Sequence, residues 1–254
     1  MSAEAAGADD RFWSRPQWTG LDYMEALRRF HEVVKPSTYF EIGVDRGRTL
    51  AIAQCASIAV DPSSRVIPAA VNNKPSCFFF NCGSDAFFRA NDPTKLFGRP
   101  IDLAFLDGLH HFEVLLRDFL HTEKHCRRGS IVLLHDCLPI DAHIARRVQN
   151  DQTYKARTAH PGHWAGDVWK TLAILKKVRN DLKIVVYDAG PTGLVAISNL
   201  DPNSTALEER YFELVAEFAP KDLFNEADAF YASLGVRNFG EHGASDLLSL
   251  EYWL

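Results

Sequence analysis

The chain has 254 residues, of which 46% are hydrophobic and 24% are charged, and its formal net charge is −5. This composition is typical of a globular protein and excludes collagen-like, coiled-coil and disordered chains. The slight acidic excess argues against nucleic acid as a partner, because proteins that bind phosphate backbones carry positive patches. One α/β domain of roughly 200 to 250 residues, with additions, fits this length.

Two further features concern the cellular compartment. Residues 1–10 lack the basic and apolar parts of a secretory signal, and no apolar stretch approaches the roughly 20 residues that a membrane helix needs. The five cysteines include no CxxC pair, which indicates neither a disulfide framework nor a zinc ribbon. We therefore expect a cytoplasmic protein with reduced thiols and no membrane partner.

The first half of the chain alternates between β-rich runs and helical patterns. Apolar spacing predicts a helix over 21–34, and a strand over 38–42 follows it. Gly47 is expected to open a helix that runs to about Cys55. Strands separated by helices indicate a parallel sheet with crossover connections. The later elements predicted in this half are strands over 57–60, 76–82, 101–106 and 130–134 and a helix over 112–126.

The second half closes the sheet differently. A helix is predicted over 167–178, and strands follow over 183–187 and 193–198. The linker between these two strands is too short for a crossover helix, so the strands must pair as an antiparallel hairpin. The fold class is therefore α/β, with a mostly parallel sheet and a terminal antiparallel hairpin. From about Thr205 onward the pattern is helical, and this part could form a lid or a homo-oligomer contact.

A glycine turn follows the first predicted strand, with Glu41, Gly43 and Gly47 around it. Glycine there lets the backbone approach a ligand closely. A dinucleotide turn has the pattern G-x-G-x-x-G, but Glu41 and Arg46 occupy two of its glycine positions, which argues against a pyrophosphate. Asp61 ends the second strand, where an acid can bind both ribose hydroxyls. Each feature alone is equally explained by a tight turn or a cap, and together they indicate a nucleoside site.

The segment from about Phe40 to Asn199 resembles class I S-adenosylmethionine (SAM) dependent methyltransferases, in which an E-x-G-x-x-x-G turn follows the first strand. The resemblance implies a Rossmann-like, seven-stranded sheet with helices on both faces, and SAM as the cofactor. A Gly-Ser-Asp turn after the third strand would lie near the adenine, although such a turn is also an ordinary helix cap. The implied cofactor contacts are Glu41, Gly43 and Gly47 at the methionine part, Asp61 at the ribose, and Ser84 and Asp85 at the adenine.

Two aspartates end neighbouring strands in the fold that this resemblance implies. Asp107 ends the fourth strand and Asp136 follows the fifth, so strand spacing puts them roughly 5 Å apart. Two unpaired carboxylates this close repel each other unless a cation intervenes. An oxygen-ligated divalent ion, with Mg²⁺ and Mn²⁺ as candidates, would relieve the repulsion and acidify a substrate hydroxyl.

The run Asp107-Gly108-Leu109-His110 resembles the D-G-x-H segment of metal-dependent O-methyltransferases that include macrolide-sugar enzymes, where the acid binds the metal and the His stands near the acceptor. This sequence departs from that subgroup at His135, where another acid is common. An imidazole suits manganese, iron or zinc better than magnesium. The candidate metal ligands are thus Asp107, Asp136 and His135. Alternatively the site is metal-free and His110 is the general base.

Two other segments carry histidines. His121 and His125 share a helix face, but they lack the HExxH pattern and point away from the predicted buried stripe, so we expect them at the surface. The loop 160–169 combines aromatic, imidazole and glycine residues and could cover an acceptor, with Trp164 stacking on its ring. Asp167 in this loop is either a catalytic residue or the N-cap of the next helix.

The sequence thus predicts an enzyme, a SAM-dependent methyltransferase that acts on a hydroxyl of a small-molecule acceptor of sugar or natural-product type. Its predicted catalytic residues are Asp107, His110 and Asp167. The expected parts are a helical lead-in over 1–36, a SAM-binding core over 37–200 and a C-terminal helical extension over 201–254 packed on the same domain. Two other classes stay open, a SAM-binding module without catalysis and a metal-dependent hydrolase.

Overall fold

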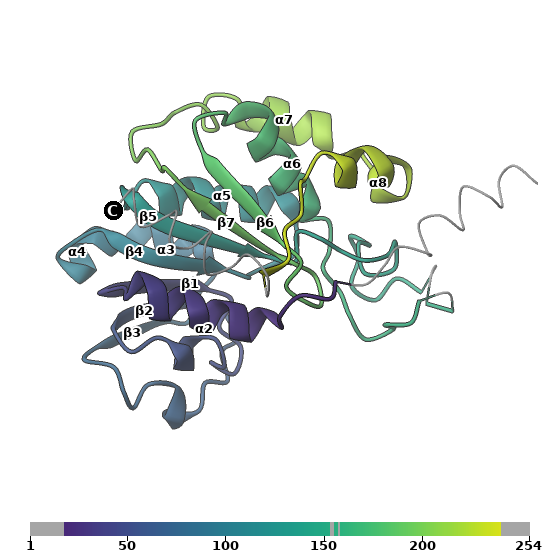
Figure 1. The fold of residues 1–254 in the computed structure, drawn as a ribbon. Coiled ribbons are helices and arrows are strands. Elements are labelled where there is room, and N and C mark those ends of the chain that lie inside the picture. Colours follow the sequence, from purple (N-terminus) through teal and green to yellow (C-terminus); the bar gives the residue numbers. More distant parts are fainter. Residues whose placement is uncertain (1–17, 153–154, 157, 240–254) are drawn as a thin grey trace, which may run out of the picture.

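The computed structural model describes residues 18–152, 155–156 and 158–239. Its centre is a seven-stranded sheet with the strand order β3-β2-β1-β4-β5-β7-β6 (Figure 1). Strands β1 to β5 pair in parallel, whereas β7 runs antiparallel to both β5 and β6. The strands are β1 (Thr38–Ile42), β2 (Ala56–Val60), β3 (Cys77–Phe80), β4 (Ile101–Leu106), β5 (Cys126–His135), β6 (Lys183–Tyr187) and β7 (Leu194–Ser198).

Helices cover both faces of the sheet, as Figure 1 shows. One face carries α2 (Tyr23–Val34) and two short 3-10 helices, η1 (Leu50–Ile52) and η2 (Pro68–Ala70). Among the described helices, none is long and apolar enough to cross a membrane. The other face carries α3 (Ser84–Ala90), α4 (Pro93–Phe97), α5 (Phe112–Glu123), α6 (Trp169–Val178), α7 (Tyr211–Phe218) and α8 (Leu223–Ala232).

Alternate residues of the central strands pack into two separate hydrophobic cores. In β1, Phe40 and Ile42 face the core beneath α5 and α6, whereas Tyr39 faces the core beneath α2. Every residue of β4 is buried, because both faces of this strand are covered. A strand covered on both faces needs a nearly continuous apolar run, and in β4 only Asp102 interrupts this run, which explains why β4 is recognisable in the sequence.

Most of the predicted elements are confirmed. The bounds of β1, β4 and β6 coincide with the predicted ranges, and α2 and α5 lie within theirs. The antiparallel hairpin is confirmed by the pairing of Lys183 with Ser198 through Tyr187 with Leu194. The predicted C-terminal helical region contains α7 and α8.

The predicted helix from Gly47 to Cys55 is wrong, because only the 3-10 turn η1 forms there. Gly47 has φ +77°, which an α-helix does not tolerate. Ala53 is already extended, and β2 begins three residues later. The connection from the glycine turn to β2 is therefore too short and too constrained for a regular helix.

The two C-terminal helices pack on the same core as α5 and α6. Leu214 and Phe218 of α7 and Phe230 of α8 are buried in it. A buried ion pair beside them joins Arg179 to Glu123, with nitrogen to oxygen distances of 2.6 and 2.8 Å. Both ends of this pair are hydrogen-bonded, which is the condition under which a buried ion pair is tolerated.

Gly43 is the tightest point between β1 and β4. Its φ is +88°, and a Cβ at this position would lie 1.9 Å from the backbone carbonyl oxygen of Asp107. Because that atom belongs to the backbone, no side-chain rotation could relieve the contact. Only glycine lets the turn after β1 approach the end of β4 this closely.

We expect Gly43→Ala to lower the free energy of unfolding by at least about 2 kcal/mol, since it combines a positive φ with a backbone clash. The measurement is denaturant unfolding of the full chain. Gly162→Ala is the matched control, because nothing lies within 4 Å of a Cβ there, and it should change stability by less than about 0.5 kcal/mol. Equal effects of the two substitutions would contradict the close approach at Gly43.

Candidate active site

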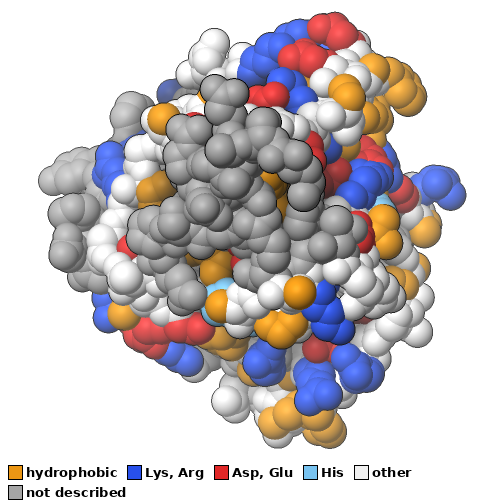
Figure 2. Space-filling view, turned by 90° about the vertical axis from the view of Figure 1, so that its right-hand side faces the viewer, with side chains coloured by type: hydrophobic (Ala, Val, Ile, Leu, Met, Phe, Trp, Pro, Cys, Tyr) orange, Lys and Arg blue, Asp and Glu red, His pale blue; other side chains and the backbone are white. Residues whose placement is uncertain are grey.

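The polar residues predicted from the sequence meet at the edge of the sheet where the parallel strands end. Figure 2 looks toward this side of the molecule, and the described residues there mix acidic, basic and hydrophobic side chains. A cavity of about 720 Å³ opens at this edge. Its lining comes from the segments after β1, β2, β3 and β4 and from α5, and includes Gly43, Asp61, Ser84, Asp85, Asp107, His110 and Val114.

Asp61 connects the cavity to the glycine turn. Its Oδ2 accepts hydrogen bonds from the backbone N–H groups of Val44 and Asp45, both at 2.8 Å, and its Oδ1 accepts one from Ser63 at 2.7 Å. The carboxylate thus fixes the path of the turn and lines the cavity as well. This is the position in which the sequence predicts a ribose contact.

A second carboxylate of the lining, Asp85, is held by a bidentate ion pair. Arg117 of α5 donates from Nε and Nη2 to its two carboxylate oxygens at 2.8 and 2.7 Å. The hydrogen bonds of Arg117 hold the pKa of Asp85 below its usual value. Ser84 lines the same end and is buried, so the two residues predicted near the adenine do share one wall.

Glu41 and Gly47 do not line this cavity, and their contact with the methionine part of the cofactor stays a prediction. Glu41 is fully buried below the turn. Its side chain points to the opposite face of β1 from that of Ile42, into the core beneath α2. Its carboxylate accepts hydrogen bonds from Thr49 Oγ1 at 2.6 Å and from the Tyr39 hydroxyl at 2.7 Å. Burial raises the pKa of Glu41 to about 8, although both hydrogen bonds oppose this shift. Glu41 therefore shapes the turn from beneath.

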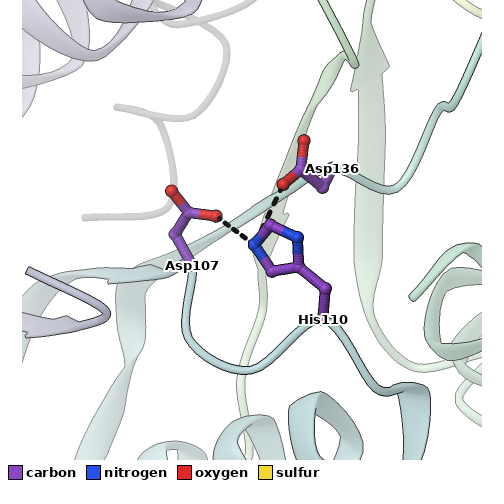
Figure 3. Close-up of side chains that lie close together, drawn as sticks. All are labelled: Asp107, His110 and Asp136. Atoms are coloured by element: carbon purple, nitrogen blue, oxygen red, sulfur yellow. Dashed lines mark ion pairs between the residues drawn. The ribbon is translucent and has the colours of Figure 1, made fainter. Parts of the chain in front are cut away.

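Asp107 and Asp136 converge on one imidazole, as Figure 3 shows. Nε2 of His110 lies 3.5 Å from Oδ1 of Asp107 and 3.2 Å from Oδ2 of Asp136. One atom from each of the three residues can be chosen so that all lie within 4.8 Å of one another. The expected closeness of the two aspartates is confirmed, since β4 and β5 are neighbours.

His135 is not part of this three-residue group, so the predicted ligand set changes, with His110 in its place. Its Nδ1 lies 3.2 Å from Oδ1 of Asp107, and its ring packs against Tyr23 at 4.2 Å between centroids. Its Nε2 is buried without a hydrogen bond among the described residues. His135 therefore supports Asp107 from the side of α2.

Electrostatics explain why two acids and two histidines share this edge. Burial would lower the pKa of His110, but its hydrogen bond to Asp107 and the charge of Asp136 raise it to about 9. Likewise burial opposes the charged form of His135, and the two aspartates still raise its pKa to about 9. Burial opposes ionisation of Asp107, yet both histidines hold its pKa below its usual value. Two carboxylates balanced by two imidazolium groups have no net charge.

The hairpin loop before β7 holds Asp136 in position. The Thr192 hydroxyl donates to Oδ1 of Asp136, and Asp136 itself has φ +61°. The same loop holds the start of α2, because Gly190 accepts a hydrogen bond from the backbone N–H of Tyr23 at 3.0 Å. Sequence reasoning missed Thr192 and Tyr23. The only signal for Thr192 was its place in the short link between two antiparallel strands, which must lie at this edge.

The loop before α6 covers His110, and its contact with an acceptor stays a prediction. The Trp164 ring stacks on the His110 ring at 4.9 Å, and Nδ1 of His110 is 2.8 Å from the Trp164 carbonyl oxygen. Asp167 does not join the group of Asp107, His110 and Asp136, and it does not cap α6, whose N-cap is Val168. It accepts from the backbone N–H of Phe112 at 3.0 Å and pairs with Arg147. It thus fixes the loop that carries His110.

His121 and His125 take no part in the site. Both are half-buried, which differs from the expected solvated surface, and both pack against Phe88 at 5.2 and 6.1 Å between ring centroids. Within the described ranges, only one group of three or more side chains has metal-ligand geometry, and its members are Asp107, His110 and Asp136.

Comparison with known proteins agrees with this geometry. Residues 40–137 match the protein family described as "Methyltransferase domain". This segment is similar to a methyltransferase domain, and it makes up less than half of the chain. The matched segment runs from β1 to the residue after Asp136 and includes the whole carboxylate and histidine group. The resemblance to class I SAM-dependent methyltransferases is thereby confirmed.

The domain's fold recurs in solved structures of low sequence identity. Cofactor-bound Rv0187 from MTB has 13% identity, with 78% of this chain and 88% of that chain covered and a TM-score of 0.50. The O-methyltransferase from Bacillus cereus in complex with SAH has 13% identity, with 69% of this chain and 80% of that chain covered and a TM-score of 0.47. No curated protein matches the chain significantly. At this identity the shared property is the fold.

We expect the stability of the methyltransferase domain to fall as the pH rises from about 4.5 to about 8, because Glu41 keeps its proton in the folded chain and loses it in the unfolded chain over this range. Glu41→Gln, which cannot ionise, should remove more than about 1.4 kcal/mol of this decline, the equivalent of one pKa unit. Denaturant unfolding of the parent chain and of Glu41→Gln at several pH values tests this expectation. A variant whose stability declines as steeply as that of the parent would contradict the raised pKa of the buried Glu41.

Proposed function

We propose that the protein transfers the methyl group of SAM to a hydroxyl of a small molecule, with a divalent cation bound by Asp107, His110 and Asp136. The observation that carries this proposal is the convergence of two carboxylates and one imidazole at the rim of the cavity. The alternative without catalysis gives no reason to hold two like charges together at that point.

The cavity fits the proposed cofactor. Its volume of about 720 Å³ lies within the usual range of small-molecule sites. Asp61 offers a fixed carboxylate for the ribose, and Asp85, after the neighbouring strand β3, lines the part of the cavity where an adenine amino group would lie. Gly43 leaves the backbone bare next to Asp107, so the sulfonium end of the cofactor can approach the carboxylate group.

The residues present also fit a divalent cation. Two carboxylates and an imidazole are ligands that Mn²⁺, Fe²⁺ and Zn²⁺ accept, and the three donors already lie within reach of one centre. Such a cation would take the place of the His110 proton between the aspartates. When bound, it would lower the pKa of an acceptor hydroxyl.

In this geometry His110 is better suited to hold a cation than to act as the general base predicted from the sequence. Its Nε2 faces two carboxylates and keeps its proton up to about pH 9. A base must be unprotonated before it can accept a proton. Asp107 Oδ2 has no hydrogen bond to the described residues, so we assign the hydrogen bond of the acceptor hydroxyl to this atom.

The transfer itself is an in-line displacement, so the chain's main task is alignment. The turn at Gly43 positions the donor, and Asp107 and Asp136 position the acceptor oxygen. Trp164, stacked over His110, covers one side of the group. Asp167 acts through the loop, because its backbone N–H and side chain fix residues 110 and 112.

We expect Asp61→Ala to weaken the binding of S-adenosylhomocysteine (SAH) at least tenfold, about 1.4 kcal/mol, because a ribose contact and the anchor of the turn are both lost. Calorimetric titration measures this. Asp92→Ala removes one charge at the N-cap of α4, outside the cavity, and should leave the affinity unchanged. Unchanged affinity in Asp61→Ala would contradict the ribose assignment, and no SAH binding by the parent chain would contradict the proposed function.

We expect His110→Ala and Asp107→Asn to keep SAH affinity within about threefold while turnover falls at least about 100-fold. Both variants should also lose Mn²⁺ binding, measured by calorimetry in EDTA-treated protein. His121→Ala is the control, since His121 lies outside the group. Retained Mn²⁺ affinity with lost turnover would return His110 to the role of a base, and Mn²⁺ uptake without SAH binding would favour a hydrolase.

A further inference from the structure

Arg117 of α5 contacts two parts of the chain that are distant in the sequence, the start of α3 and the start of α7. Its Nε and Nη2 donate to the two carboxylate oxygens of Asp85 at 2.8 and 2.7 Å. Its Nη1 donates to the Tyr211 hydroxyl at 2.5 Å and to the backbone carbonyl oxygen of Glu113 at 3.1 Å. Asp85 and Arg117 line the cofactor cavity, whereas Tyr211 does not. Arg117 therefore joins the wall of the cavity to a residue outside it.

Tyr211 is the first residue of α7 and is half-buried. Its hydroxyl accepts the hydrogen bond from Arg117 and donates its own proton to the Glu113 carbonyl oxygen at 3.0 Å. The guanidinium carbon of Arg117 lies 5.8 Å from the centre of the Tyr211 ring, within the range of a cation–π contact. Leu214 and Phe218 of the same helix are buried in the core shared with α5. The packing of α7 thus fixes the hydroxyl that holds Arg117.

Asp85 can still accept hydrogen bonds while Arg117 is bound to it. An ionised carboxylate offers about four lone-pair positions on its two oxygens, and a forked guanidinium occupies one position on each oxygen. The hydrogen bonds of Arg117 hold the pKa of Asp85 below its usual value, so the carboxylate is ionised at neutral pH and can only accept. The Asp85 side chain is 45% exposed and lines the cavity, so a ligand can reach the remaining positions.

Adenine and hypoxanthine differ at the atoms that such a carboxylate would meet. Adenine has an amino group at C6 and an acceptor at N1, whereas hypoxanthine has a carbonyl oxygen at C6 and an N–H at N1. A carboxylate that is free to move could bind either base, because it could shift to the N–H of hypoxanthine. A carboxylate held in a fork cannot shift, and it would face the C6 oxygen without a hydrogen bond. Rigid placement of Asp85 therefore favours adenine.

We propose that Tyr211 is a positioning residue of the cofactor site, which acts through Arg117 to hold the Asp85 carboxylate against the amino group of the adenine. In this way the site selects adenine over hypoxanthine. The inference rests on the proposed function, because it requires the adenine of SAM to lie at Asp85. It also gives α7, a helix of the C-terminal region, a part in cofactor recognition. Loss of the Tyr211 hydroxyl frees one arm of the guanidinium group and lets Asp85 move with it.

The test compares SAH with S-inosylhomocysteine, in which hypoxanthine replaces the adenine. Calorimetric titration of the full chain measures both dissociation constants. We expect the parent chain to bind SAH at least about tenfold more tightly than S-inosylhomocysteine. Tyr211→Phe, which removes only the hydroxyl, should lower this preference at least about threefold. A merely structural effect would weaken both ligands by the same factor, so the ratio of the two constants separates positioning from stability.

The matched control is Tyr231→Phe. Tyr231 also lies in a C-terminal helix, and its hydroxyl also donates to a backbone carbonyl oxygen, that of Pro139, but it does not line the cofactor cavity. This variant should keep the preference of the parent chain. Arg117→Lys is a second test, because lysine keeps the positive charge but cannot form the fork. It should lower the preference at least as much as Tyr211→Phe does.

Several outcomes overturn this inference alone. One is a parent chain that binds SAH but does not prefer it to S-inosylhomocysteine. Another is a preference that stays unchanged in Tyr211→Phe or in Arg117→Lys, including the case in which both ligands weaken equally. A third is an equal loss of preference in Tyr231→Phe. Failure of the parent chain to bind SAH refutes the proposed function instead.

Discussion

The repulsion between Asp107 and Asp136 is the constraint on which this site depends. Neighbouring parallel strands bring the two carboxylates to one edge, and burial strengthens their mutual repulsion. The chain answers with two imidazoles, His110 from the loop after β4 and His135 from the end of β5. The arrangement is neutral without a ligand, and a cation that displaces the His110 proton leaves the carboxylates paired.

Contacts with the backbone of the turn after β1 determine where each part of the site lies around this group. Gly43 lets the turn after β1 touch the end of β4, and Asp61 fixes that turn through two backbone N–H groups. Glu41 fixes its far side from within the core. The cofactor cavity therefore depends on a short connection in which a 3-10 turn, and no regular helix, follows Gly47.

The hairpin of β6 and β7 has a functional consequence as well as a topological one. Because β7 runs antiparallel to β5, the loop between the two hairpin strands reaches the same edge as Asp136. Thr192 of this loop holds Asp136, and Gly190 holds the first residue of α2. The position of Tyr23 over His135 thus depends on a loop more than 160 residues later in the chain.

The sequence by itself determined the strands, the hairpin and the acids at the strand ends, because strand burial on both faces and short links leave local patterns of apolar and glycine residues. Asp61, Asp107 and Asp136 were found in this way. Only the tertiary structure decided that Glu41 points into the core, that His110 and not His135 completes the three-residue group, and that Asp167 fixes a loop. Those outcomes depend on side-chain direction and on partners such as Thr49, Thr192 and Arg147, which are distant along the chain and leave no periodic signal in it.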